Sequence, residues 1–217
     1  IRQVVFSPPL SPFYAGQALE VMRMLAERFP DARRMCAFHL ADSSAGAGSR
    51  SENSAAMTPE VAAKNLRIRA AAADLDFDVL ELAGDVANLA VYDACDLHVG
   101  YECHAHLYFL STRRPSVLVA EDARGIGFND TLGVGGFTGF ARAGGPTQVA
   151  RKKHTSGYCT TAAELAEAPP RQDLARTIDR FLREETETGF RRYLGLPAWL
   201  DETYERAMRP FIRSLPR

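Results

Sequence analysis

Two histidines and a glutamate lie within five positions of one another near the middle of the chain. Glu102, His104 and His106 follow a short apolar run at 97–99 that is typical of a buried strand. An imidazole titrates near neutral pH, so a histidine oriented by a carboxylate can exchange protons with a hydroxyl or a leaving oxygen. The alternative for each histidine is a structural hydrogen bond at the start of a helix. Because the three side chains are clustered, we favour a catalytic role for His104.

This histidine spacing gives little support for a metal site. His104 and His106 are two positions apart, so they diverge on a helix and share a face only on an extended loop. A zinc pair on a helix needs a spacing of four, which only Glu102 and His106 have. We therefore expect neither a metal nor a cofactor.

A second polar cluster follows the apolar run at 116–120. It consists of Glu121, Asp122, Arg124 and Gly125. Asp122 has the position of a helix N-cap, which is the simplest role for it. A cation such as Arg124 is unfavourable in the first turn of a helix unless an anion joins it, which suggests an acidic ligand, and Gly125 would let the backbone approach that ligand.

Both clusters belong to an alternating pattern of short apolar strands and helices. Strands are expected at 3–7, 34–40, 79–82, 97–99 and 116–120, and helices at 14–29, 58–74, 85–94 and 124–132. A further helix is expected between the strands at 97–99 and 116–120, opened by the first polar cluster. This alternation predicts an α/β fold with an open, mostly parallel, Rossmann-like sheet and helices on both faces. In such a sheet the loops at the carboxyl ends of the strands carry the ligand, so loops 100–106 and 121–127 should share one cleft.

The remaining segments are less regular. Residues 41–57 are rich in Ser, Ala, Gly and Asn, and we expect a mobile loop that could act as a lid. Between 133 and 168 the pattern allows one short edge strand. Amphipathic helices are expected at 173–187 and, after a break at Leu196-Pro197, at 200–212. We therefore predict a Rossmann-like domain at 1–168 and a C-terminal helical extension at 169–217.

Composition narrows the function classes. The 217 residues carry a net charge of −1, so a nucleic-acid partner is not expected. Cys36, Cys95, Cys103 and Cys159 form no Cys-x-x-Cys pair, and we interpret them as reduced thiols of a cytoplasmic protein, with Cys36 and Cys95 as small buried hydrophobes. No apolar run is long enough for a transmembrane segment.

The central forty residues also resemble a known family. The segment 100–106 reads GYECHAH and is followed by a leucine-rich helix, Arg-Pro-Ser, and an apolar strand that ends in EDARG at 121–125. This resembles the carboxyl-terminal half of the polysaccharide pyruvyl transferase family, whose two domains form a GT-B arrangement. The family transfers a pyruvyl group from phosphoenolpyruvate to a sugar of an envelope polysaccharide as a ketal. The resemblance covers roughly the first 135 residues. It implies that the N-terminal domain of the family has no counterpart in this sequence.

On this resemblance His104 is the histidine of the family's glycine-x-arginine-x-histidine motif and acts as acid or base. Glu102 stands where that motif has arginine, and a glutamate would repel the phosphate and carboxylate of the donor. Either another cation such as Arg124 or Arg113 replaces that arginine, or the chain has kept the fold without the donor chemistry.

Three functions therefore remain open for the predicted cleft. The first is a pyruvyl transferase, with His104, Glu102 and Arg124 catalytic. The second is a GT-B-like glycosyltransferase with a nucleotide-sugar donor, and the third is a binding or assembly domain without turnover. For the two enzymes we expect a saccharide acceptor, and we expect a homo-oligomer or a separate N-terminal domain as a macromolecular partner. The residues expected to bind the substrate are Gly100, Tyr101, His106, Glu121, Asp122 and Gly125.

Overall fold

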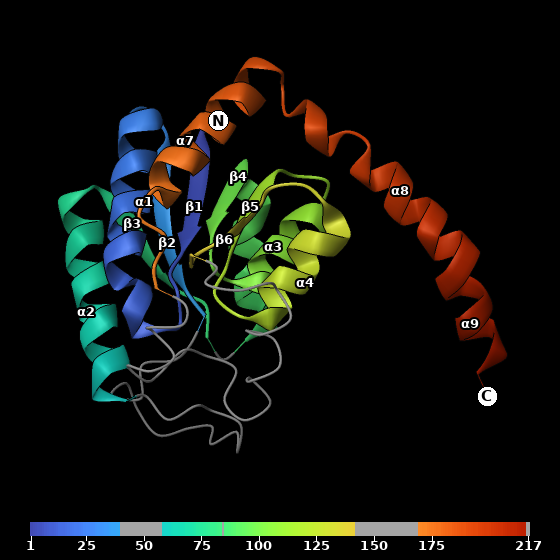
Figure 1. Ribbon diagram of the computed structural model, residues 1–217, viewed down its shortest axis with the longest axis horizontal. Helices are drawn as coiled ribbons and strands as arrows, with labels where there is room; N and C mark the ends of the chain where they lie inside the picture. Colours follow the sequence, from blue (N-terminus) through green and yellow to red (C-terminus); the bar gives the residue numbers. More distant parts are fainter. Residues whose placement is uncertain (40–57, 84, 142–168, 216–217) are drawn as a thin grey trace.

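Six parallel strands form a single open sheet in the computed structural model, which describes residues 1–39, 58–83, 85–141 and 169–215 (Figure 1). Their order across the sheet is β3-β2-β1-β4-β5-β6, so the direction of winding reverses between β1 and β4. Each pairing is parallel, as in Val5 beside both Met35 and His98. The strands are β1 (Gln3–Ser7), β2 (Arg33–Phe38), β3 (Phe77–Glu81), β4 (Leu97–Gly100), β5 (Ser116–Ala120) and β6 (Gly136–Thr138). The predicted Rossmann-like α/β fold is confirmed, and β6 is the short edge strand.

Helices cover both faces of this sheet. The α-helices are α1 (Ala15–Arg28), α2 (Pro59–Asp74), α3 (Cys103–Ser111), α4 (Ala123–Leu132), α7 (Leu174–Glu187), α8 (Leu196–Thr203) and α9 (Arg209–Ser214). Short 3₁₀ segments are η1 (Pro12–Tyr14), η2 (Val86–Ala94) and η3 (Arg191–Tyr193), and η4 (Tyr204–Met208) is a π-helical turn. In Figure 1, α1, α2 and α7 lie on one side of the sheet, and α3 and α4 lie on the other.

The two layers of core follow the alternation of side chains along the strands. Val4 and Phe6 pack into the layer beneath α1, α2 and α7, whereas Val5 packs with Tyr92 of η2 and Phe109 of α3. Cys36 and Cys95 are buried and unbridged, as predicted, and burial raises the pKa of the Cys36 thiol to about 12. Each face of the sheet therefore carries its own buried apolar layer.

Most helices start close to the positions expected from the sequence. The Thr58 hydroxyl accepts from the Val61 amide, and Pro59 occupies the first turn of α2. Asp85 caps the next segment, but that segment is a 3₁₀ helix and not the α-helix expected at 85–94. The side chains of this segment explain the difference. Its two β-branched valines disfavour an α-helix, and with only Tyr92 buried there is little packing to stabilise one.

The C-terminal segment contains helices as predicted, including the amphipathic helix expected at 173–187, and it differs in where a later helix begins. Leu196-Pro197 does not break a helix, because α8 begins there and a proline in the first turn leaves no amide unpaired. In addition, α7 packs against α1 and buries Leu174, Ile178 and Leu182 in the main core. Among the described residues, no helix is both long and apolar enough to cross a membrane. The loop expected at 41–57 lies outside the described residues.

Candidate functional site

A cavity of about 500 Å³ opens at the carboxyl ends of the strands. It lies beside the ends of β1 and β4, where the strand order reverses, which is the usual ligand position in an open parallel sheet. Residues that follow five of the strands, β1 to β5, and one face of α2 line it. Its polar and charged lining side chains are His39, Lys64, Asn65, Asp85, Tyr101, Glu102, His104, Glu121, Asp122 and Arg124. The two predicted site loops therefore do meet over one cavity.

Glu102 and His104 form a hydrogen-bonded pair at the start of α3. Glu102 is the N-cap, and its Oε1 accepts from the His104 amide at 3.1 Å and from the His104 Nδ1 at 2.7 Å. The backbone amide of Glu102 donates in turn to the Ser7 Oγ at 3.1 Å, which fixes the cap to the end of β1. Because the His104 side chain is 73% exposed, a ligand in the cavity can reach it.

Glu121 is a buried carboxylate in the lining of the cavity. Its two oxygens accept hydrogen bonds from the amides of Leu10 and Ser11 at 2.8 and 2.9 Å. Burial raises the pKa of Glu121 to about 7, although those two amides and the nearby Lys64 act in the opposite direction. Glu121 can therefore change its protonation state near neutral pH.

Lys64 places a buried cation in the same wall. Its Nζ donates to the carbonyl oxygen of Pro9 at 2.5 Å, and burial lowers the pKa of Lys64 to about 8 while Glu121 opposes that shift. Lys64 and Glu121 thus both bind the backbone of the loop after β1. Sequence reasoning missed Lys64, although it lies four and eight positions before the buried Ile68 and Ala72 of α2 and so on their side of the helix.

Asp122 and Arg124 form the second predicted pair. The Asp122 side chain caps α4, accepting from the amides of Arg124 and Gly125 at 2.9 and 3.1 Å. The Arg124 guanidinium donates through Nε and Nη2 to Asp122 Oδ2 at 3.0 and 2.8 Å. This carboxylate offsets the unfavourable position of a cation at a helix N-terminus. The exposed guanidinium still borders the cavity and can contact an anion there.

His39 also lines the cavity and was not among the predicted site residues. Its Nε2 lies 2.5 Å from the hydroxyl oxygen of Tyr92. Burial lowers the pKa of His39, while Glu102 acts to raise it. Its position at the carboxyl end of a strand was the signal that could have identified it.

Two glycines expected to contact substrate instead permit close packing. A Cβ at Gly100 would lie 2.3 Å from the carbonyl oxygen of Ser7, and one at Gly125 would lie 2.8 Å from the Cα of Ala120. Neither glycine lines the cavity. Each is required because another backbone segment occupies the space of a side chain.

His106 lies behind the cavity and does not line it. Its Nδ1 is 2.8 Å from Ser116 Oγ, which is 2.7 Å from His98 Nδ1, and His98 Nε2 is 2.8 Å from Ser7 Oγ. Burial lowers the pKa of His106 to about 4 and lowers that of His98 well below its ordinary value. This buried chain of side chains ends at the serine that supports the Glu102 amide.

No protein-family model matches the chain, and neither the curated proteins nor the solved structures gave a match. Within the described parts of the chain, no group of three or more His, Cys, Asp or Glu side chains is arranged to hold a metal ion. The groups that border the cavity can exchange protons and can hold hydroxyls or an anion.

Proposed function

We propose that the protein is a transferase of the polysaccharide pyruvyl transferase type, which moves a pyruvyl group from phosphoenolpyruvate to a saccharide. The observation that carries this proposal is the Glu102–His104 pair at the mouth of the cavity, with Arg124 and Lys64 lining the same space. The pair supplies a proton acceptor, and the two cations supply positive charge for a donor with a phosphate and a carboxylate.

The hydrogen bond to Glu102 determines which ring nitrogen of His104 can accept a proton. A carboxylate only accepts hydrogen bonds, so His104 donates from Nδ1 and the neutral ring keeps Nε2 as an acceptor. That nitrogen takes the proton of a saccharide hydroxyl as its oxygen bonds to C2 of phosphoenolpyruvate, while the methylene carbon takes a proton from the protonated carboxyl of Glu121 and becomes a methyl. The proton held by His104 then returns through solvent to the Glu121 carboxylate. A second hydroxyl then attacks C2, the C–O bond to phosphate breaks, and that hydroxyl's proton ends on the released phosphate. The products are a ketal and inorganic phosphate.

Among the described residues that line the cavity, carboxylates outnumber lysines and arginines, and this supports a polyhydroxyl acceptor. Glu102, Glu121, Asp122 and Asp85 can accept hydrogen bonds from saccharide hydroxyls, whereas Arg124 and Lys64 are the charged groups suited to the donor. Glu121, with its pKa near 7, can also give a proton to an oxygen or carbon atom.

A glycosyltransferase that uses a nucleotide sugar is the second candidate. The position of the cavity favours it, because dinucleotide and mononucleotide ligands bind at the reversal of strand order in sheets of this connectivity. In that reaction the Glu102–His104 pair would again accept a hydroxyl proton from the acceptor. The two candidate functions differ in their donor, which is phosphoenolpyruvate in the first and a nucleotide sugar in the second.

Donor binding tests the proposal directly. We expect isothermal titration to show saturable binding of phosphoenolpyruvate, and Glu102→Arg to raise the affinity at least tenfold because a cation replaces an anion beside the donor. Glu102→Gln removes the charge without adding a cation and is the matched control, with a smaller gain expected. Saturable binding of a uridine or guanosine diphosphate sugar in place of phosphoenolpyruvate would favour the second candidate. If neither donor binds the wild type or Glu102→Arg, both transferase proposals are wrong and a binding or assembly domain is favoured.

A further inference from the structure

The C-terminal helical segment formed by α8, η4 and α9 projects away from the body of the molecule (Figure 1). From Tyr204 to Leu215, the last residue that the structure describes, every residue is exposed. A helix this short is marginal in water by itself and gains its stability from packing. We therefore expect this segment to pack against a surface that the described residues do not supply.

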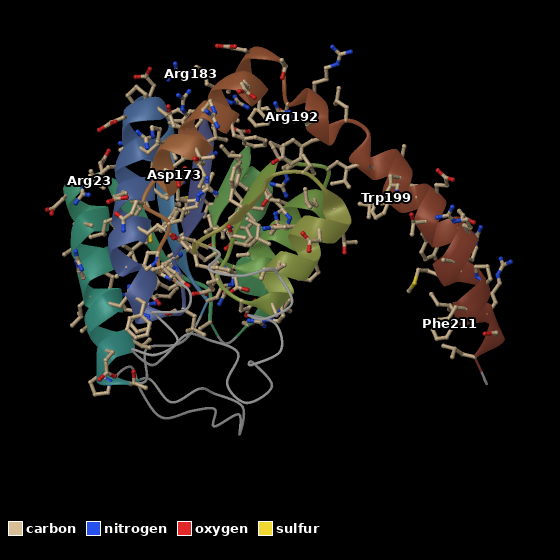
Figure 2. All side chains as sticks on the ribbon, viewed as in Figure 1. Arg23, Asp173, Arg183, Arg192, Trp199 and Phe211 are labelled. Carbon is tan, nitrogen blue, oxygen red and sulfur yellow. The ribbon has the colours of Figure 1, made fainter. Side chains whose placement is uncertain are left out.

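One side of this segment is apolar. Leu200, Tyr204, Met208, Phe211 and Leu215 follow one another at spacings of four, four, three and four. The π-helical turn at Tyr204–Met208 keeps the four-residue spacings on one side. Figure 2 shows Trp199 and Phe211 pointing from the same side of the ribbon, and Phe211 is 58% exposed. Tyr204, Met208, Phe211 and Leu215 form an exposed apolar surface of the kind that marks an interaction site. Leu200, at the start of this surface, is half-buried against the body of the protein.

Charge is divided along the length of the same segment. Asp201, Glu202 and Glu205 lie in its first half, and Arg206, Arg209 and Arg213 lie in its second half. An antiparallel copy of the segment would place each acidic half beside a basic half. The segment is therefore complementary to itself in charge as well as in its apolar surface.

We infer that α8, η4 and α9 pair antiparallel with the same segment of a second copy of this chain, about a two-fold axis between Ala207 and Met208. Around that axis Leu200 faces Leu215 and Tyr204 faces Phe211. A two-fold interface requires that residue i contacts j while j contacts i, and these apolar pairs satisfy it. A partner of different sequence would not require such symmetry.

The charged groups fit the same register. Glu202 of each copy faces Arg213 of the other, so one ion pair forms on either side of the axis. Arg206 and Arg209 also face each other across the axis, but Arg209 is bound by Glu205 on its own helix, which lowers their repulsion. Asp201 lies 3.3 Å from Arg113 of its own chain.

Sedimentation velocity of the 217-residue chain across a hundredfold range of concentration tests this inference. We expect a dimer whose dissociation constant rises at least tenfold in Phe211→Glu. Leu66→Glu is the matched control, because Leu66 is a 67% exposed leucine on α2, and it should leave the dimer unchanged. A monomer at every concentration, or a dimer that Phe211→Glu does not weaken, overturns the inference.

Charge reversal tests the register itself. Glu202→Arg alone and Arg213→Glu alone should each weaken the dimer, because each makes two like-charged contacts. The double variant, or a mixture of the two single variants, should restore it, since every 202–213 pair then joins opposite charges. Failure of both the double variant and the mixture to restore the dimer overturns the antiparallel register. These measurements do not depend on the proposed transferase function.

Discussion

The carboxylate of Glu102 accepts two hydrogen bonds from His104, one from the backbone amide at 3.1 Å and one from Nδ1 at 2.7 Å. A single residue therefore caps α3 and selects the tautomer of the imidazole that follows it. The pair is anchored to β1 through the Ser7 hydroxyl, and through it to the buried histidines behind the cavity. Glu102 therefore contributes both to the stability of α3 and to the proposed proton transfer by His104.

Removal of the His104 imidazole should reduce turnover far more than donor binding. In His104→Ala we expect kcat for phosphoenolpyruvate-dependent release of phosphate, with a saccharide acceptor, to fall by about 10²- to 10⁴-fold, because general base catalysis is lost. The Kd for phosphoenolpyruvate should change little. His104→Gln is the control, since it keeps a polar side chain without a titrating group, and it should lose as much activity. A kcat within twofold of wild type in either variant would contradict the role.

The titration of Glu121 should respond to Lys64. Lys64 favours the ionised carboxylate, so Lys64→Met should move the pKa of Glu121 upward from about 7, as followed by the ¹³C chemical shift of its carboxyl carbon. Lys64→Arg keeps the positive charge and should leave the pKa nearer to the wild-type value. A pKa that falls in Lys64→Met would mean that the two groups are not coupled as described.

Two glycines of α4 provide a packing test within one helix. Gly125→Ala should destabilise the protein by about 1–3 kcal/mol, because the new Cβ meets the Ala120 backbone at 2.8 Å. Gly127→Ala should instead be neutral or stabilise by about 0.5–1 kcal/mol, because nothing lies within 4 Å and alanine favours a helix. Urea unfolding of both variants measures the difference. Equal effects would show that α4 does not pack this closely on the end of β5.

Acid should destabilise the protein through its buried histidines. The pKa of His106 is lowered to about 4 in the folded protein, so between pH 6.5 and 4 the unfolded chain binds more protons. The contribution of His106 is present above pH 6.5 and decreases as the pH falls, reaching a loss of about 3 kcal/mol near pH 4. His98, whose pKa is also lowered, adds to the loss in the same direction.

Urea unfolding at several pH values between 7 and 4 measures this dependence. His106→Leu should flatten part of the pH dependence, although it lowers stability at pH 7 by removing the bond to Ser116. An unchanged slope in His106→Leu would show that this residue does not titrate as a buried group.

Much of the fold was predictable because its strands and helix caps depend on local chemistry. The strands Gln3–Ser7 and Ser116–Ala120 are centred on short apolar runs. Thr58 and Asp122 are the N-caps of α2 and α4, which begin close to the positions expected from the sequence. The loss of an α-helix at Val86–Ala94 was less predictable, since it depends on how few of its side chains the sheet buries.

The site was predictable in position and less so in its members. The carboxyl ends of parallel strands meet at one edge, so Glu102, His104, Glu121, Asp122 and Arg124 could be expected to share a cavity. Lys64 comes from a distant helix, and its place in the wall depends on how α2 packs. His106 and Gly125 follow the correct strands, but the direction of a side chain and the approach of a neighbouring backbone are tertiary properties.

The most direct test of the central claim is a titration of the ¹⁵N-labelled protein with phosphoenolpyruvate, followed by amide chemical shifts. The account predicts that the amides of residues 101–104 and of Arg124 shift together, with one saturable dissociation constant, because both loops face the same ligand. Shifts confined to surfaces away from the cavity, or amides at these positions that stay unchanged at saturating donor, would contradict it.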